Sequence, residues 1–261
     1  SVYAMGGAQA IGALAFGTAS VPRVDVIAGP GNAYVAEAKR QVFGRVGIDS
    51  IAGPTDVLIV ADSKACQGGA RLIALDMIAQ AEHDPLASAI VLVPGLTEAQ
   101  QVLRGLDFEL GRRGRGTENP AGIKTASEAL GRNGLIVAYK TMDNAAAIAN
   151  TIAPEHLELH CASAESLVPR FVNYGSLFIG ARAGEVLGDY AAGINHTLPT
   201  GGSSRFAGGL SVRTFLKCAT TLACAGSEGM RELLEACRIL AEAEGLYGHS
   251  ESARVRGESI A

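Results

Sequence analysis

The 261-residue sequence contains no tryptophan, only 5% aromatic residues and no long apolar run. Its longest apolar stretches, such as residues 89–93, have the length of one strand, whereas a helix needs about 20 apolar residues to cross a bilayer. We therefore expect no membrane partner. Glycine is abundant, with 33 residues, and 48% of the chain is hydrophobic. This composition is typical of an α/β enzyme with tight turns between strands and helices.

The sequence also lacks an excess of positive charge. Lysine and arginine total 22 against 26 acidic residues, which gives a net charge of -4. The densest basic stretch is Arg112, Arg113 and Arg115, in a glycine-rich segment that we interpret as a solvated loop. Nucleic-acid binding requires a clustered positive face, so we expect no nucleic-acid partner.

The five cysteines form no CxxC pair and no regular framework. An odd number of scattered thiols favours a reducing cytoplasm, and we expect each to be a small buried apolar residue. The chain begins Ser1-Val2-Tyr3 without methionine and enters a glycine-rich turn at once. We interpret it as a fragment that lacks an N-terminal region.

Short apolar runs alternate with helical patterns along most of the chain. This order predicts a largely parallel sheet covered on both faces. We expect an α/β fold with incomplete Rossmann-like parallel sheets in two related domains, followed by a C-terminal helical tail. The expected strands cover residues 2–4, 24–27, 57–60, 89–93, 135–139, 157–160 and 176–179. The expected helices cover residues 8–16, 33–43, 70–82, 98–110, 125–130, 143–152 and 164–171.

Two pairs of polar residues stand at the ends of expected elements. His83 lies in the last turn of an expected helix, three residues after Gln80, so both side chains could reach one metal ion. A capped helix end is the structural alternative. His156 follows Glu155 in a turn just before an expected strand, which is either a catalytic carboxylate–imidazole pair or an ordinary turn.

Further nitrogen and oxygen donors lie toward the C-terminus. Residues 188–209 form a long glycine-rich segment without a clear period that carries Asp189 and His196. Long irregular segments inside compact domains are usually either functional or disordered. His249 follows Glu244 by five residues in the helical tail. Histidine, glutamine and aspartate donors without a thiolate suit zinc or a similar divalent ion. His160 has no functional neighbour in the sequence, and we expect it to be structural or exposed.

Two glycine-rich turns join strands to helices near the start of the chain. They are Gly6-Gly7-Ala8-Gln9 and Gly29-Pro30-Gly31-Asn32. Glycine lets the backbone approach a ligand closely, and helix N-termini point N–H groups at anions such as a pyrophosphate. Neither turn matches GxGxxG, so tight turns in an α/β sheet remain the alternative to nucleotide binding.

Taken in order, these segments resemble the histidinol dehydrogenase family. The resemblance covers nearly the whole chain, without the family's N-terminal portion. The matching strings are GGAQAIGALAFGT, VDVIAGPGNAYVAEAKRQV, AGPTDVL, AQAEHDP, APEHLEL, GDYAAGINHTLPT, RFAGGLSVRTFLK and AEAEGLYGH.

The resemblance implies a role for each candidate residue. Glu155 and His156 match the catalytic pair. The implied zinc ligands are Gln80, His83, Asp189 and His249, the last supplied to the partner subunit's site in a homodimer. The implied NAD-binding positions are Gln9 and Asn32. The implied substrate-binding positions are Thr55, Gln80, His83, His156, Asp189, His196, Glu244 and His249.

The resemblance also implies the reaction and the domain plan. Family members use zinc and NAD to oxidise L-histidinol to L-histidine in two hydride transfers, through an aldehyde that is not released. We expect residues 1–56 to be a partial NAD-binding domain, 57–210 the zinc- and substrate-binding catalytic domain, and 211–261 a helical dimerisation tail.

Two departures from the family pattern leave alternatives open. Thr55 stands where serine is common, and the segment between Thr55 and Gln80 is a few residues longer than usual. A paralogue with the same zinc site that oxidises another small alcohol, such as a sulfonated diol, is one alternative. An inactive truncated domain that dimerises or binds NAD weakly is the other.

Overall fold

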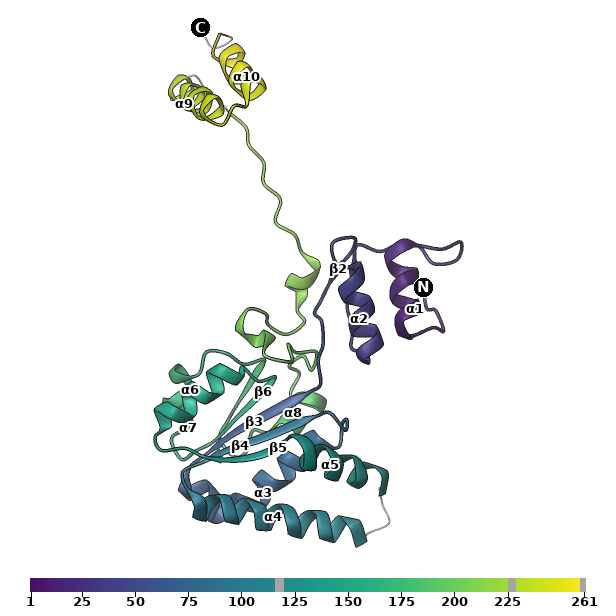
Figure 1. Ribbon diagram of the computed structural model, residues 1–261, viewed down its shortest axis with the longest axis vertical. Coiled ribbons are helices and arrows are strands. Elements are labelled where there is room, and N and C mark those ends of the chain that lie inside the picture. Colours follow the sequence, from purple (N-terminus) through teal and green to yellow (C-terminus); the bar gives the residue numbers. More distant parts are fainter. Residues whose placement is uncertain (116–119, 225–228, 259–261) are drawn as a thin grey trace. The chain divides into compact units, whose positions relative to one another are not determined.

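The computed structural model describes residues 1–115, 120–224 and 229–258 (Figure 1). The chain divides into two compact units, Ser1–Leu216 and Lys217–Ala261. Among the described helices, none combines the length and apolar character needed to cross a membrane. Each unit is best understood by itself.

The first unit begins with two helices and a small parallel sheet. Helices α1 (Gly7–Phe16) and α2 (Ala33–Val42) pack together, and strands β1 (Val26–Ile27) and β2 (Gly47–Ile48) pair in parallel. Their shared apolar core contains Ile11, Ala15, Ile27, Val35, Val42 and Val46.

A buried ion pair fixes the glycine-rich turn before α2. The Lys39 side chain, only 3% exposed, donates from Nζ to Asp49 Oδ1 at 2.6 Å and to the Gly29 carbonyl at 2.5 Å. Asp49 in turn accepts the Gly29 N–H at 2.8 Å. Because Gly29 has a φ of +138°, which side chains disfavour, this turn depends on glycine and on the ion pair that holds it.

A five-stranded, all-parallel sheet forms the centre of the unit, in the order β5-β4-β3-β6-β7. The chain fills one side of β3 first and then crosses to the other, so β3 and β6 meet at the switch point of a doubly wound sheet. The strands are β3 (Asp56–Ala61), β4 (Ser88–Val93), β5 (Gly134–Ala138), β6 (His156–His160) and β7 (Ser176–Ile179). The helices are α3 (Ser63–Ala81), α4 (Leu96–Arg115), α5 (Pro120–Asn133), α6 (Met142–Ile152), α7 (Ala164–Leu167) and α8 (Glu185–Tyr190).

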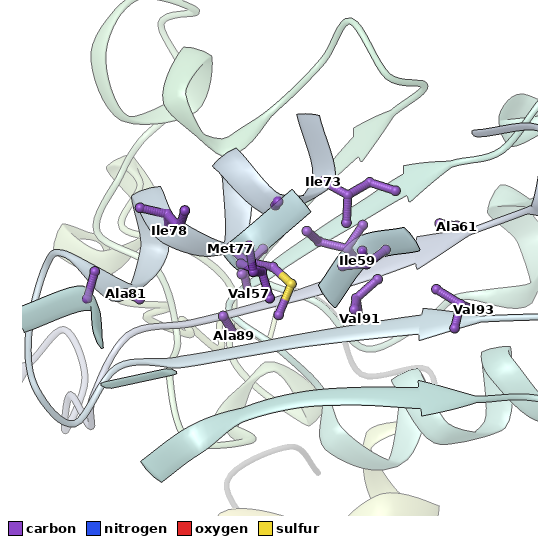
Figure 2. Close-up of a cluster of buried hydrophobic side chains, with 14 of the residues drawn as sticks. Val57, Ile59, Ala61, Ile73, Met77, Ile78, Ala81, Ala89, Val91 and Val93 are labelled. Carbon is purple, nitrogen blue, oxygen red and sulfur yellow. The ribbon is translucent and has the colours of Figure 1, made fainter. Parts of the chain in front are cut away.

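Both faces of β3 are buried, which explains its continuous apolar sequence. Figure 2 shows one face, where Val57 and Ile59 of β3 pack beneath Ile73 and Met77 of α3. The opposite face of β3 and its neighbour β6 packs against α6, through a cluster that includes Leu58, Val60, Ala149, Leu157 and Leu159.

The expected α/β fold with parallel sheets and C-terminal helices is confirmed. The second unit contains two helices that pack on each other, α9 (Met230–Ala243) and α10 (Tyr247–Glu258). The division into residues 1–56, 57–210 and 211–261 stays a prediction.

Four details of the expected elements are wrong. Residues 2–4 form no strand, because no described segment pairs with them. The stretch around Arg112 is the end of α4 and not a loop, since Arg112 pairs with Glu109 one turn earlier at 2.8 Å. Helix α3 ends at Ala81, so His83 lies just beyond it. The segment 188–209 is irregular except where α8 and a short 3-10 turn occupy it.

The cysteines differ in environment, and all five are free thiols. Cys66, in the first turn of α3, is buried in the core as expected, and Cys161 is partly buried. The expectation of burial is wrong for Cys218, Cys224 and Cys237, which are exposed.

We predict that Ile59→Ala lowers the free energy of unfolding by about 2–5 kcal/mol, because Ile59 is 0% exposed at the centre of the sheet and its loss leaves a cavity. Leu103→Ala, on the half-exposed outer side of α4, should cost less than about 1 kcal/mol. Urea unfolding of both variants measures the difference. Equal losses would show that this core does not stabilise the sheet.

Candidate functional site

The candidate site lies at the amino-terminal edge of the central sheet. Thr55 precedes β3, and Glu155 and His156 stand at the start of β6. Helix α3 runs back across the sheet and brings Gln80 and His83 to the same edge. Ligands of doubly wound sheets usually bind at the opposite, carboxyl-terminal edge, so this placement is unusual.

Glu155 is a buried carboxylate, 5% exposed, with partners on the β3 side. Its Oε2 accepts the Thr55 hydroxyl at 2.5 Å and the Asp56 N–H at 3.2 Å. Its own N–H donates to Asp56 Oδ1 at 2.9 Å. Burial raises the pKa of Glu155 to about 7, against the opposing effects of His156 and Thr55. Glu155 can therefore exchange a proton near neutral pH.

A second group of donors surrounds His83. His83 Nε2 lies 3.6 Å from Glu185 Oε1 and 3.7 Å from Asp189 Oδ2. The ligand atoms of these three residues all lie within 4.8 Å of one another. Ligands of a tetrahedral zinc ion stand about 3.4 Å apart, given metal–ligand distances near 2.1 Å. The spacing of these three side chains is therefore close to that of a metal site, and they could hold a metal ion.

Gln80 joins this group to Thr55. With its amide nitrogen toward α8, Gln80 donates to Glu185 Oε2 at 2.6 Å and Oε1 at 3.0 Å. Its amide oxygen then lies 2.8 Å from the Thr55 hydroxyl, which donates its single proton to this oxygen when Glu155 is protonated and acts as the donor to Thr55. This orientation pairs both ends of a side chain that is fully buried. Glu155, Thr55, Gln80 and Glu185 thus form one hydrogen-bonded line across the site.

His156 lies between the two groups and is 3% exposed. Its Nδ1 is 3.9 Å from Glu185 Oε2, and its Nε2 is 3.8 Å from Asp189 Oδ1. Its ring stands 6.0 Å from the Phe178 ring, centroid to centroid. One imidazole is therefore flanked by carboxylates that it shares with His83.

The sequence-based list omitted Glu185, which contacts Gln80, His83 and His156. Burial raises the pKa of Glu185, and the Glu185 carboxylate in turn raises the pKa of His83. The spacing of Glu185 and Asp189, four residues apart, would have been a signal if α8 had been predicted as a helix.

The sequence-based list also omitted a second cluster further along β6. His160 Nε2 lies 3.0 Å from Glu158 Oε2 and 3.6 Å from Asp76 Oδ2. Burial and the nearby Glu158 carboxylate raise the pKa of Asp76 to about 7. His160 is buried among these carboxylates, which is consistent with the expected structural role, but its ionisable neighbours were not evident from the sequence. It also lines a hollow of about 770 Å³ at the carboxyl-terminal edge, which contains none of the expected site residues.

The remaining expected site residues of the first unit lie outside these groups. Gln9 is exposed in the first turn of α1. Asn32 begins α2, where its Oδ1 accepts the N–H groups of Tyr34 and Val35 at 3.1 and 3.2 Å. His196 is exposed on the irregular segment after α8.

The second unit brings Glu244 and His249 together. Glu244 ends α9, and His249 lies in the first turn of α10. Both line one hollow of about 390 Å³ between these helices, with Leu240, Ala241 and Leu246 among the other lining residues. The turn that joins the helices uses Gly245 at a φ of +74°.

Comparison with known proteins identifies the chain's relatives. The sequence profile of histidinol dehydrogenase matches residues 1–257. A histidinol dehydrogenase from Synechococcus is 46% identical over 259 residues, which cover 99% of this chain and 57% of that protein. One from Chlorobium chlorochromatii is 45% identical over 260 residues, covering 100% and 58%.

A solved structure agrees with these sequences. The crystal structure of histidinol dehydrogenase from Elizabethkingia anophelis matches with a TM-score of 0.85 and 36% identity, covering 98% of this chain and 56% of that one. The chain thus spans between half and three fifths of the length of these relatives. A profile match over almost every residue, with the same fold, shows that the chain belongs to the histidinol dehydrogenase family.

Proposed function

We propose that the protein to which this chain belongs oxidises L-histidinol to L-histidine with zinc and NAD. The observation that carries this proposal is the arrangement at the amino-terminal edge, where the buried Glu155–His156 pair faces the donors His83, Glu185 and Asp189. An acid–base pair beside a metal-binding group is suited to oxidising an alcohol that also carries nitrogen ligands.

Gln80, His83 and Asp189 would hold the zinc ion, with His249 as the fourth ligand in a shared homodimeric site. Zinc, when bound, orients the amine and imidazole nitrogens of the substrate. Glu185 supports this arrangement, because its carboxylate accepts hydrogen bonds from the Gln80 amide nitrogen and its Oε1 lies 3.6 Å from His83 Nε2. Glu244 and His196 would contact the substrate, as their counterparts do in the family.

His156 is the proposed base for the first oxidation. It takes the hydroxyl proton of the alcohol while the carbon-bound hydrogen leaves as hydride, which NAD, when bound, accepts. The nearby carboxylates of Glu185 and Asp189 stabilise the resulting imidazolium. The products of this step are the aldehyde, NADH and one proton held by His156.

Glu155 is the proposed base for the second oxidation. It removes a proton from water as the oxygen adds to the aldehyde, and the resulting hydrate anion then gives a second hydride to a second NAD, when bound, which leaves the carboxylic acid. A carboxyl group with a pKa of about 7 is a far stronger base than an ordinary glutamate, so Glu155 is suited to this step near neutral pH.

Gln9 and Asn32 are the proposed NAD-binding residues. Each lies at the N-terminal end of a helix that follows a glycine-rich turn, where backbone N–H groups favour an anion. The Asn32 side-chain oxygen is engaged in capping α2, so its amide nitrogen is the atom left for a ligand. We further propose a cytoplasmic location.

The decisive test measures NADH absorbance with the intact protein, zinc, NAD and L-histidinol. We predict two NADH per histidinol, and a loss of turnover of at least about 100-fold in His156→Ala and Glu155→Ala, with zinc retained.

Turnover of another small alcohol alone would favour the paralogue, for which the Thr55 methyl group is the relevant difference. No turnover of any alcohol would favour an inactive domain.

We predict that His83→Ala weakens zinc binding by more than about 100-fold, because it removes the central nitrogen donor of the metal group. Competition with a chromophoric chelator measures the affinity. Glu82→Gln changes an exposed neighbouring charge and serves as the control. Unchanged zinc affinity in His83→Ala would remove His83 from the ligand set.

We predict that Glu155→Gln changes how stability depends on pH. The pKa of Glu155 is raised from 4.5 to about 7 in the folded state, because burial favours the protonated carboxyl group. The contribution of Glu155 to the free energy of unfolding is therefore fully present below pH 4.5 and is lost as the pH rises through 7. Between pH 4.5 and 8 the parent should lose up to about 3 kcal/mol relative to the glutamine variant. Urea unfolding of the zinc-free proteins at both pH values measures this; parallel pH profiles would contradict it.

A further inference from the structure

Strand β6 carries two ionisable side chains that the proposed reaction does not use. Glu158 and His160 follow His156 at two-residue spacing, so all three project from the same face of the strand. This is the α3 side of the sheet, because His156, Glu158 and His160 pair with Val57, Ile59 and Ala61 of β3. Glu158 is 0% exposed and His160 is 2% exposed.

Both carboxylate oxygens of Glu158 have partners. Oε1 accepts the backbone N–H of Glu185 at 2.7 Å, and Oε2 lies 3.0 Å from His160 Nε2. The bond to Glu185 is buried and joins residues 27 apart in the sequence. It therefore connects the middle of β6 directly to the first residue of α8.

Helix α8 depends on such an external contact. It has six residues, too few to be stable alone, and Gly184 at its N-terminus provides no side-chain cap. The Glu158 carboxylate serves instead as the acceptor for a first-turn N–H group, with a charge that suits a helix N-terminus. Helix α8 in turn carries Glu185 and Asp189, which both approach His83 and His156.

We infer that Glu158 is a positioning residue for the metal-binding side of the site, acting through the Glu185 backbone to hold α8 and its carboxylates in place. His160 holds the second oxygen of Glu158 and so fixes its rotamer. The link to zinc rests on the proposed function, whereas the anchoring of α8 does not.

The test compares Glu158→Gln with Glu158→Leu in the intact protein to which this chain belongs. Glutamine keeps a side-chain oxygen that can accept the Glu185 N–H, whereas leucine has a similar volume and no acceptor. Glu109→Gln is the matched control, since Glu109 on α4 is equally buried but pairs with Arg71 of α3 and Arg112 of α4. Hydrogen–deuterium exchange of α8 and zinc affinity by chelator competition are the two measurements.

We expect faster exchange in α8 and about 10- to 100-fold weaker zinc binding in Glu158→Leu, with both properties close to the parent's in Glu158→Gln and Glu109→Gln. Unchanged α8 exchange in Glu158→Leu would overturn the inference, whether or not the chain binds zinc. Faster exchange with unchanged zinc affinity would reduce Glu158 to a structural role and also overturn it. A second zinc ion per chain, lost in Glu158→Leu, would show that Asp76, Glu158 and His160 bind metal instead.

If the parent protein binds no zinc, the proposed function fails, and the exchange measurement still decides whether Glu158 anchors α8. If Glu158→Leu does not fold, the comparison moves to Glu158→Gln against Glu158→Ala. If α8 in Glu158→Ala then exchanged its amide hydrogens as slowly as in the parent, the anchoring role would be contradicted.

Discussion

The structure depends on the burial of ionisable side chains along one face of β6. His156, Glu158 and His160 project toward α3, beside an apolar core in which charges are poorly solvated. Each of these side chains therefore requires a polar partner at a fixed place. Helix α3 supplies Asp76 beside His160, and α8 supplies the Glu185 N–H to Glu158. This requirement constrains the positions of β6, α3 and α8 relative to one another.

The same constraint explains why the candidate site lies at the amino-terminal edge of the sheet. Helix α8 begins beside the middle of β6, and its last turn places Asp189 near His156, at the start of the strand. Helix α3 ends at that edge as well and delivers Gln80 and His83. The row formed by His156, Glu158 and His160 therefore begins at the candidate site. At its other end, His160 lines the hollow of about 770 Å³ at the opposite edge of the sheet.

Local patterns predicted most of the fold, but not the partners of buried polar groups. The apolar runs of β3 and β4 identified these strands to within one residue at each end, whereas the periodicity of α3 gave its end but placed its start seven residues late. The alternation in β6 gives a strand, yet it is the pattern of a half-exposed one, so nothing local indicates that Glu158 and His160 are buried. Helix α8 was missed for a related reason: a six-residue helix held by a distant carboxylate has no local period.

Thr55 shows how the two halves of the site are joined. A threonine hydroxyl has one proton to donate and can also accept. When Glu155 is ionised, that proton goes to Glu155 Oε2; when Glu155 is protonated, Glu155 becomes the donor, and the Thr55 proton is free for the Gln80 oxygen. Gln80 then directs its nitrogen to Glu185 on the metal-binding side. The protonation of Glu155 and the orientation of Gln80 are thus linked through one hydroxyl group, which threonine supplies as well as serine does.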